Sequence, residues 1–549
     1  MNSPGRRRSA LCCVLVVVLA GCVAPPKPDF DPPEQTIGER LFLETRFAEY
    51  FAAHMTDVNA PLAPGDPVVQ QVQNVYSGPM PGPFAGQSIN CRSCHFVDEF
   101  QGVPKAGNRT YADFTTRSPI PLAMNGFTAT PRNAMQMVGS LQPHAGPIFL
   151  HFDGEFATPE DLVRGTLTGR NFGWAPDQYQ QAVAHIAQVI RQDNGKGMLA
   201  ASYGKLSYAT TLLGTGVNIP IELKLPVKYR LDVSTATDEQ ILDTVAELIT
   251  QYMDSLLFQQ DSAGRYIGSP YDVFLKINDL PRQPDPGETN AQYVQRLAQA
   301  VSSLTNPKFV DGKLGEFQFH SQPFTFGATE LAGLQIFLKA ALGAPDASQH
   351  AGNCAACHAP PNFTDFRFHN TGVSQEEYDA ANGEGAFAAL AVPSLAVRSA
   401  DYDAYLPASA NHPNATERFR HAAVAGSPQY ADLGLWNVYL NPDIPAPQMN
   451  LTSVVCANIQ NCAVDQGLAG TIAQFKTPTL RDLEDSAPYF HNGSKLTFND
   501  VVQFYVTNSE VARVGLLRNA PPEFQGMSID TDDIPALAAF LISLTEDYH

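Results

Sequence analysis

Two stretches of the sequence carry residues whose types and spacing suit redox chemistry. The pattern CxxCH, the attachment signal of a c-type haem, occurs twice, in Cys91, Cys94 and His95 and in Cys354, Cys357 and His358. On a helical turn the two thiols reach the vinyl groups of one porphyrin, and the histidine that follows lies beneath the iron as proximal ligand. The sequence therefore predicts two covalently bound haem c groups.

Other uses of CxxC fit less well. A zinc site needs four ligands, and neither pair has further cysteines nearby to complete the set. A dithiol redox pair does not need the histidine, and here it is present both times. With nine cysteines and 13 histidines in 549 residues, two chance occurrences are improbable.

The N-terminus indicates export. Arg6, Arg7 and Arg8 form a basic head, and an apolar run follows that is too short to span a membrane as a mature helix. Leu19-Ala20-Gly21-Cys22 has the form of a bacterial lipobox, so we expect residues 1–21 to be a lipoprotein signal peptide and Cys22 to be acylated. Residues 22–34 would be a Pro-rich tether. Val23 after Cys22 is typical of outer-membrane lipoproteins. We therefore expect a lipoprotein of the outer membrane, on either the periplasmic or the cell-surface side.

The remaining cysteines also have assignments. Cys12 and Cys13 leave with the signal peptide, which leaves Cys456 and Cys462. In an oxidising compartment we expect these two to close a short loop as a disulfide.

Composition and charge bound the class of protein. The chain is 44% hydrophobic and 16% charged, with 43 prolines and 40 glycines, which predicts a globular, loop-rich, mainly helical protein of two domains. The formal net charge of -20 argues against a nucleic-acid partner and favours a cationic protein partner. No second apolar run reaches membrane-spanning length, so we expect membrane attachment through the lipid alone.

The chain contains an internal repeat. Phe152-Asp153-Gly154, Thr158 and Asp161-Leu162-Val163 match His491-Asn492-Gly493, Thr497 and Asp500-Val501-Val502 in spacing. Helix-like segments also precede the two haem motifs at residues 37–42 and 332–337, each with Gly-x-x-aliphatic-Phe. The pattern indicates two copies of one haem domain.

These motifs resemble those of the bacterial di-haem cytochrome c peroxidase and MauG family. The resemblance is densest in the second half, in residues 352–358, 361–365, 368–373, 475–481 and 487–494. It implies a mainly α fold of two cytochrome c-like haem domains, at residues 35–320 and 321–549. Residues 175–320 show no family motif and include a helix expected from Thr237 to Leu257, so we expect a helical insertion in the N-terminal, peroxidatic domain.

The resemblance implies roles for single residues. In the family the C-terminal haem transfers electrons, and counting from His491 places its second ligand at Tyr505; a core aromatic is the alternative. For the N-terminal haem, no histidine occurs between His95 and His144, so we expect an open iron, with Met124, Met135 and Met137 as alternative ligands. Glu160 falls at the position of the family's proton-transferring glutamate, although Thr158-Pro159-Glu160-Asp161 is also a good helix start.

The resemblance also implies a calcium ion between the domains, held by carbonyls of Ser486 and Pro488 and by an asparagine, for which Asn133 is the candidate. Oxygen ligands of this kind suit calcium. The family's bridging tryptophan is missing, because Trp174 and Trp436 are the two tryptophans of the chain and neither stands at the expected position.

Three functions fit this pattern. The first is a peroxidase that reduces hydrogen peroxide with electrons from a small donor protein. The second is a MauG-like oxidase of aromatic side chains in a protein substrate, and the third is an electron-transfer di-haem cytochrome without catalysis. Tyr505 favours the second, and the frequency of peroxidases in the family favours the first.

Overall fold

The computed structural model describes residues 31–63, 65–66, 73–74, 78–79, 88–95, 132–312, 317, 322–343, 346–457, 462–484 and 486–546. Over these residues the chain is helical and rich in loops, and the strands that occur are two residues long and form three antiparallel pairs. The expected mainly α fold is confirmed. None of the helices in the described part is long and apolar enough to cross a bilayer.

The first half contains helices and one strand pair before the second haem domain begins. They are α1 (Pro33–Phe42), α2 (Glu49–His54), β1 (Gln73–Asn74), β2 (Gly78–Pro79), α4 (Pro159–Thr168), α5 (Tyr179–Gln192), α6 (Met198–Ser202), α7 (Tyr208–Leu213), α8 (Asp238–Ser255), α9 (Pro270–Ile277), α10 (Asn290–Ser302) and β3 (Val310–Asp311).

The second half completes two strand pairs and adds further helices. They are β4 (Thr325–Phe326), α11 (Ala328–Leu338), β5 (Phe368–His369), α12 (Val373–Asn382), α13 (Leu395–Ala400), α14 (Tyr402–Tyr405), α15 (Gln448–Val455), α16 (Val464–Gly470), β6 (Phe475–Lys476), α17 (Phe498–Arg513) and α18 (Ile534–Ile542).

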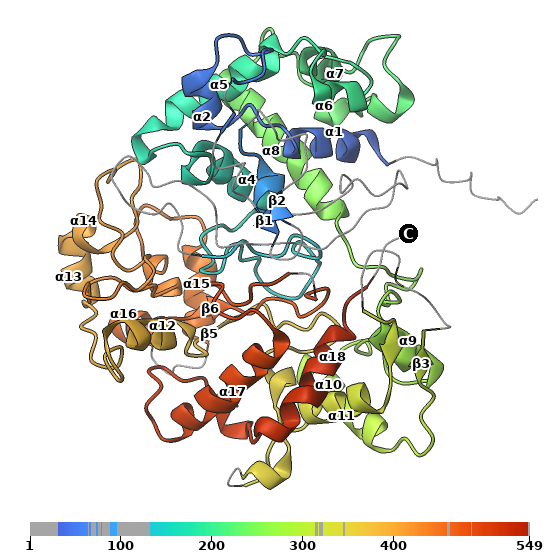
Figure 1. Ribbon diagram of the computed structural model, residues 1–549. Coiled ribbons are helices and arrows are strands. Elements are labelled where there is room, and N and C mark those ends of the chain that lie inside the picture. Colours follow the sequence, from blue (N-terminus) through green and yellow to red (C-terminus); the bar gives the residue numbers. More distant parts are fainter. Residues whose placement is uncertain are drawn as a thin grey trace, which may run out of the picture.

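Three hydrophobic cores organise these elements. The first takes residues from Ile37 to Tyr266, the second from Tyr271 to Leu544, and the third mainly from residues 368–473 around the fully buried Trp436. Figure 1 shows helices α1, α5 and α8, which contribute to the first core, at the top, and α17 and α18, which contribute to the second, at the bottom; α12 to α16, around the third core, lie at the left. The predicted domain boundaries stay a prediction.

The helix that precedes each haem motif packs closely against a second helix. A Cβ atom on Gly38 of α1 would lie 2.0 Å from the Leu248 carbonyl oxygen of α8, and one on Gly333 of α11 would lie 2.0 Å from the Ala536 carbonyl oxygen of α18. Both positions therefore need glycine, because the partner backbone occupies the space of a side chain. The two predicted pre-haem helices form, and they pack in the same way.

The repeat downstream of each haem motif is also structural. Leu150 pairs with Phe156 and Tyr489 pairs with Lys495, in two bridges 339 positions apart. In each turn Thr158 or Thr497 caps the next helix, accepting a hydrogen bond from the backbone N–H of Asp161 or Asp500 at 3.1 Å. Position n in this part of the first half thus corresponds to position n plus 339 in the second.

The region without a family motif is helical, as predicted. Its longest helix, α8, has Thr237 as N-cap, and the Gln240 side chain returns a hydrogen bond to the Thr237 backbone N–H. Val245, Leu248 and Ile249 of α8 are buried in the first core, so α8 belongs to the body that surrounds the first haem motif. Helices α9 and α10 instead contribute Phe274 and Tyr293 to the second core.

Candidate functional site: two haem cavities with a shared wall

The first CxxCH segment forms a single tight turn. The 3-10 helix η1 (Cys91–Ser93) is capped by Asn90, whose side chain accepts from the Ser93 N–H and donates to the Leu43 carbonyl at 2.8 Å. The His95 N–H donates to the Cys91 carbonyl at 2.9 Å, which closes the turn. Cys91, Cys94 and His95 all line one cavity of about 700 Å³.

The second segment repeats this turn. In the 3-10 helix η7 (Cys354–Ala356), the His358 N–H donates to the Cys354 carbonyl at 2.8 Å. Cys354, Cys357 and His358 line a second cavity, of about 270 Å³. The structure thus brings together the three residues of each motif at the wall of its own cavity.

Both histidines are prepared for a metal. Burial lowers the pKa of His95 to about 4 and also lowers the pKa of His358, so each imidazole is neutral, which is the form that ligates iron. His358 Nδ1 lies 3.0 Å from the Phe363 carbonyl. A proton on Nδ1 donated there leaves Nε2 free as the ligand.

The cysteines fit covalent attachment. Cys91, Cys94, Cys354 and Cys357 are free thiols, and burial raises the pKa of Cys91 and of Cys354 to about 12. No metal cluster of four thiolates is present among the described residues, since each pair lies in a separate cavity. The donor sets therefore fit two c-type haems.

The two cavities differ at the position of Tyr505. Tyr505 of α17 lines the second cavity with Cys357 and His358, and 339 positions earlier Thr166 of α4 lines the first. Burial raises the pKa of Tyr505 above its ordinary range, so without a metal the phenol keeps its proton. Where the second cavity has a tyrosine side chain, the first therefore has the shorter side chain of a threonine, which also carries a hydroxyl group.

A shared wall separates the cavities. Residues 133–136, Ser140, Phe152 and Lys476 line both. Phe152 is the aromatic member, and its ring lies 6.2 Å from that of His491. Trp174 lies in the first core and Trp436 in the third, so Phe152 takes the place between the cavities.

Lys476 is the charged residue of the shared wall. Its Nζ donates to the Phe149 carbonyl at 2.6 Å, and its backbone N–H donates to the Phe152 carbonyl at 2.7 Å. Burial lowers the pKa of Lys476 to about 8. One positive charge that titrates near neutral pH therefore lies between the two haem cavities.

A polar group that sequence reasoning missed also lines the first cavity. His151 Nδ1 lies 3.2 Å from Glu155 Oε2, and Arg420 donates to the same carboxylate at 2.7 Å. Burial alone would raise the pKa of Glu155, but Arg420 and His151 hold it well below its ordinary value. His151 has a φ of 63°, a backbone conformation that non-glycine residues rarely adopt and that clusters at functional sites.

Glu160 lies outside this group of residues. It is half-buried in the first turn of α4 and is not among the residues that line the first cavity, whereas Glu155 and Asp161 are. The corresponding residue of the second half, Asn499, is exposed on α17. The signal for His151 and Glu155 was available in the repeat, because His151 corresponds to Phe490, which lines the second cavity.

The predicted calcium residues lie together. The Asn133 side-chain amide donates to the Pro488 carbonyl at 2.5 Å, and Asn133 and Ser486 line the second cavity with Pro488. Asn133 Oδ1 is buried and has no hydrogen-bond partner. The amide nitrogen of Asn133, and not Oδ1, faces the Pro488 and Phe490 carbonyls, so the calcium site stays a prediction.

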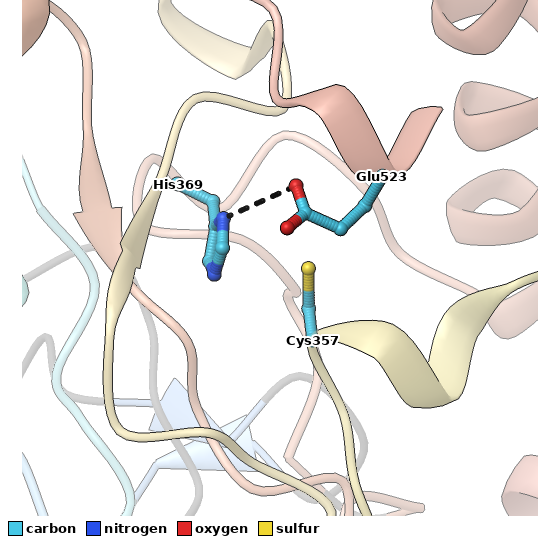
Figure 2. A group of neighbouring side chains, drawn as sticks. All are labelled: Cys357, His369 and Glu523. Atoms are coloured by element: carbon cyan, nitrogen blue, oxygen red, sulfur yellow. Dashed lines mark ion pairs between the residues drawn. The ribbon is translucent and has the colours of Figure 1, made fainter. Parts of the chain in front are cut away.

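A second donor cluster belongs to the haem site itself. Cys357, His369 and Glu523 offer ligand atoms within mutual reach, and Figure 2 shows His369 facing the Glu523 carboxylate, with the Cys357 sulfur close by. His369 lies 2.8 Å from Asp365 and 4.0 Å from Glu523. Because Cys357 belongs to the haem motif, we interpret this cluster as an ion-pair group at the haem edge.

The remaining predicted residues have simple outcomes. Cys456 and Cys462 form a disulfide with a Cα–Cα distance of 5.6 Å. Met135 lines both cavities and Met137 the first. Cys22 and Met124 lie outside the described residues.

Comparison with known proteins agrees with this site. Over 159 residues the chain is 28% identical to the cytochrome-c peroxidase IdrP2 of Denitromonas iodatirespirans. This segment of the chain is therefore similar to part of a cytochrome-c peroxidase. The match covers 28% of this chain and 28% of that relative, and no protein-family model matches.

Solved structures similar to this chain include two kinds of protein. The di-haem peroxidase BthA of Burkholderia thailandensis E264 has a TM-score of 0.38 and 16% identity, with 94% of this chain and 86% of that chain covered. A MauG-like protein associated with microbial copper homeostasis has a TM-score of 0.37 and 14% identity, covering 95% and 91%. Both TM-scores are low, so the relationship rests on the shared segment and the haem motifs.

Proposed function

We propose that the protein is a di-haem c-type peroxidase that reduces hydrogen peroxide at the N-terminal haem, with electrons passing through the C-terminal haem. The observation that carries the proposal is the pair of CxxCH turns, each at the wall of its own cavity, with one wall in common. The similarity to a cytochrome-c peroxidase supports the same reaction. Each haem, when bound, supplies an iron that exchanges electrons with substrate or donor.

The protein side chains make the two sites unequal. His95 and His358 would each hold one haem iron, and Tyr505, which lines the second cavity with His358, would be the second ligand of that iron. Thr166 takes the corresponding place in the first cavity. Its side chain is shorter than that of Tyr505 and would not reach an iron held by His95. The first site therefore leaves room for hydrogen peroxide.

Reduction of peroxide needs a group that takes a proton from one oxygen and delivers it to the other. The resemblance predicts Glu160 for this role, and the cavity lining favours His151. Glu155 contacts the His151 ring at Nδ1, and Arg420 in turn donates to Glu155, which leaves His151 Nε2 available to exchange a proton. We propose His151 as the proton-transfer group, with Glu155 as the residue that positions it.

The second site is proposed to receive electrons from a small donor protein. Phe152 and Lys476 occupy the wall through which electrons pass to the first site. A phenylalanine ring does not carry a radical readily, so the transfer would be a single tunnelling step. The oxygen donors around Asn133, Ser486 and Pro488 are proposed to hold one calcium ion at this wall.

The localisation is also a proposal. The lipobox around Cys22 supports an outer membrane lipoprotein on the periplasmic or cell-surface side, and the Cys456–Cys462 disulfide fits an oxidising compartment.

The test is peroxide turnover by the haem-loaded protein. We expect two haems per chain by pyridine haemochrome assay, and oxidation of a reduced small cytochrome c that requires hydrogen peroxide. Peroxide consumption only in the presence of one specific protein, with oxidised aromatic residues in its peptides, would favour the MauG-like alternative. Absence of peroxide-dependent turnover would leave an electron-transfer cytochrome and contradict the proposal.

A further inference from the structure

The helical insertion carries an exposed apolar surface that the haem sites do not use. We define the insertion face as residues 196–230, which include α6, α7 and the 3-10 helices η4 (Ile221–Leu223) and η5 (Val227–Tyr229). Its exposed apolar side chains, with their exposed fractions, are Met198 at 63%, Leu213 at 42%, Val217 at 98%, Ile221 at 64% and Val227 at 77%. These five side chains belong to one short segment of the chain, which concentrates exposed apolar groups within 30 positions.

The pieces of this segment are held together. A Cβ on Gly204 would lie 2.7 Å from Leu223 Cδ1, and one on Gly214 would lie 2.8 Å from Arg230 Nε. The Leu231 N–H donates to the Leu212 carbonyl at 2.9 Å. Buried Leu212, Leu223 and Tyr229 fix the segment to the first core, so its outer side chains project from a rigid base.

The insertion face is also cationic in an acidic protein. Residues 196–230 contain five basic residues and one acidic residue, Glu222, which gives a local net charge of +4 against -20 for the whole chain. Four of the five are exposed lysines: Lys196, Lys205, Lys224 and Lys228. Lysines around apolar side chains match an anionic phospholipid surface, where the charges bind headgroups and the apolar groups enter the interface.

The N-terminal segment emerges beside this face. Helix α1 packs on η4, and the hydrogen bond with Tyr229 and then the charge of Glu34 in α1 raise the pKa of Lys228. Eleven positions separate the predicted acylated Cys22 from Pro33 at the start of α1, which is about 40 Å of fully extended chain at most. Figure 1 shows α1, α6 and α7 together at one end of the molecule, opposite α17 and α18.

We propose that the insertion face lies on the phospholipid surface, so that the acyl chain at Cys22 and this face together orient the protein. The contact goes beyond the lipid anchor and does not depend on the peroxidase proposal. It places the first core against the membrane and the second core away from it.

The test uses the mature haem-loaded protein with a cysteine introduced at one exposed position and labelled with an environment-sensitive dye. Val217→Cys probes the insertion face, and Val514→Cys, 69% exposed just after α17, is the matched control. Vesicles contain phosphatidylglycerol and phosphatidylcholine, with a quencher on the acyl chains. We expect a blue shift and quenching for the Val217 label and neither for the Val514 label.

A charge variant tests the electrostatic part. In the labelled Val217→Cys protein, Lys224→Glu with Lys228→Glu should weaken the quenching response on the order of tenfold, because each lysine near an anionic surface contributes to binding. Lys276→Glu, at an exposed lysine of α9, should leave the quenching response unchanged.

Equal responses of the two labels, or no response at Val217, would overturn the proposal. A Val217 signal that changes with protein concentration without vesicles would also overturn it and assign the face to a second copy of the chain. Haem spectra and peroxide turnover should be unaffected in every case, which separates this test from that of the proposed function.

Discussion

At the residue scale, the two halves differ most at His151 and Thr166, which correspond to Phe490 and Tyr505. In the second half the Phe490 and Tyr505 rings lie 6.1 Å apart. In the first half an imidazole backed by a carboxylate and a short hydroxyl stand at these positions. Under the proposed function, these smaller polar groups would leave room for hydrogen peroxide above His95 and would supply a proton donor.

The first prediction concerns this histidine. We expect His151→Ala to slow the reaction of the first haem with hydrogen peroxide by about 10²–10⁴-fold, the usual contribution of a proton-transfer group. Stopped-flow spectroscopy of the haem band measures the rate directly. Glu160→Gln is the comparison variant, and a loss of rate in Glu160→Gln but not in His151→Ala would assign the role to Glu160.

The second prediction concerns Lys476. Its pKa is lowered by burial to about 8, so it carries a positive charge below that pH and loses the charge above it. A nearby positive charge stabilises ferrous over ferric haem, so the reduction potentials should fall as pH rises through about 8. The size should be on the order of 1 kcal/mol, roughly several tens of mV. Potentiometric titration of Lys476→Met should show no such step, and a step of unchanged size in that variant would refute the assignment.

At the element scale, each haem turn depends on a helix pair packed through glycine. The third prediction is that Gly38→Ala and Gly333→Ala each lower the free energy of unfolding by about 1–3 kcal/mol, because a methyl group would overlap a backbone carbonyl. Gly197→Ala is the control, since a Cβ there meets no atom within 4 Å. Denaturant titration followed by far-UV circular dichroism measures the change. An equal free energy of unfolding for all three variants would contradict the prediction, because it would show that each helix pair can move apart to accept a methyl group.

The elements were predictable where sequence periodicity or a cap decides them. Thr158, Thr237 and Thr497 all cap the helices that their sequences indicate. The third core around Trp436 was not predictable, because it joins short helices and loops from residues 368–473 through contacts that no local pattern records.

The candidate site was predictable to a similar extent. The CxxCH motifs fix their own geometry over five residues, so their turns follow from sequence alone. The shared wall joins Phe152 to Lys476, which are 324 positions apart, and the Glu155–Arg420 pair joins residues 265 apart. Such pairs depend on the packing of whole domains. The repeat register pairs His151 with Phe490 of the Tyr-Phe-His motif, which was the signal in the sequence for His151.

At the scale of the whole molecule, charge is distributed unevenly. The chain carries -20 in total, while the insertion face carries +4. A cationic electron donor would therefore be attracted to the rest of the surface and not to the insertion face. This arrangement leaves the donor access to the second haem domain while the insertion face lies on the membrane.

The fourth prediction follows from this charge. Turnover with a cationic small cytochrome as donor should fall as ionic strength rises, because salt screens the attraction. Steady-state measurement of kcat/KM at increasing salt checks it. A donor of opposite charge serves as the control, and a rate that rises with salt for the cationic donor would contradict the predicted partner class.

The central claim is that the first haem has an open coordination position and the second does not. The EPR spectrum of the fully haem-loaded ferric protein reports this directly, because spin state follows the number of iron ligands. We predict one high-spin signal, which belongs to the His95 haem, and one low-spin signal, which Tyr505→Ala converts to high-spin. Two low-spin signals in the unmodified protein would show that both irons are closed and would contradict the account.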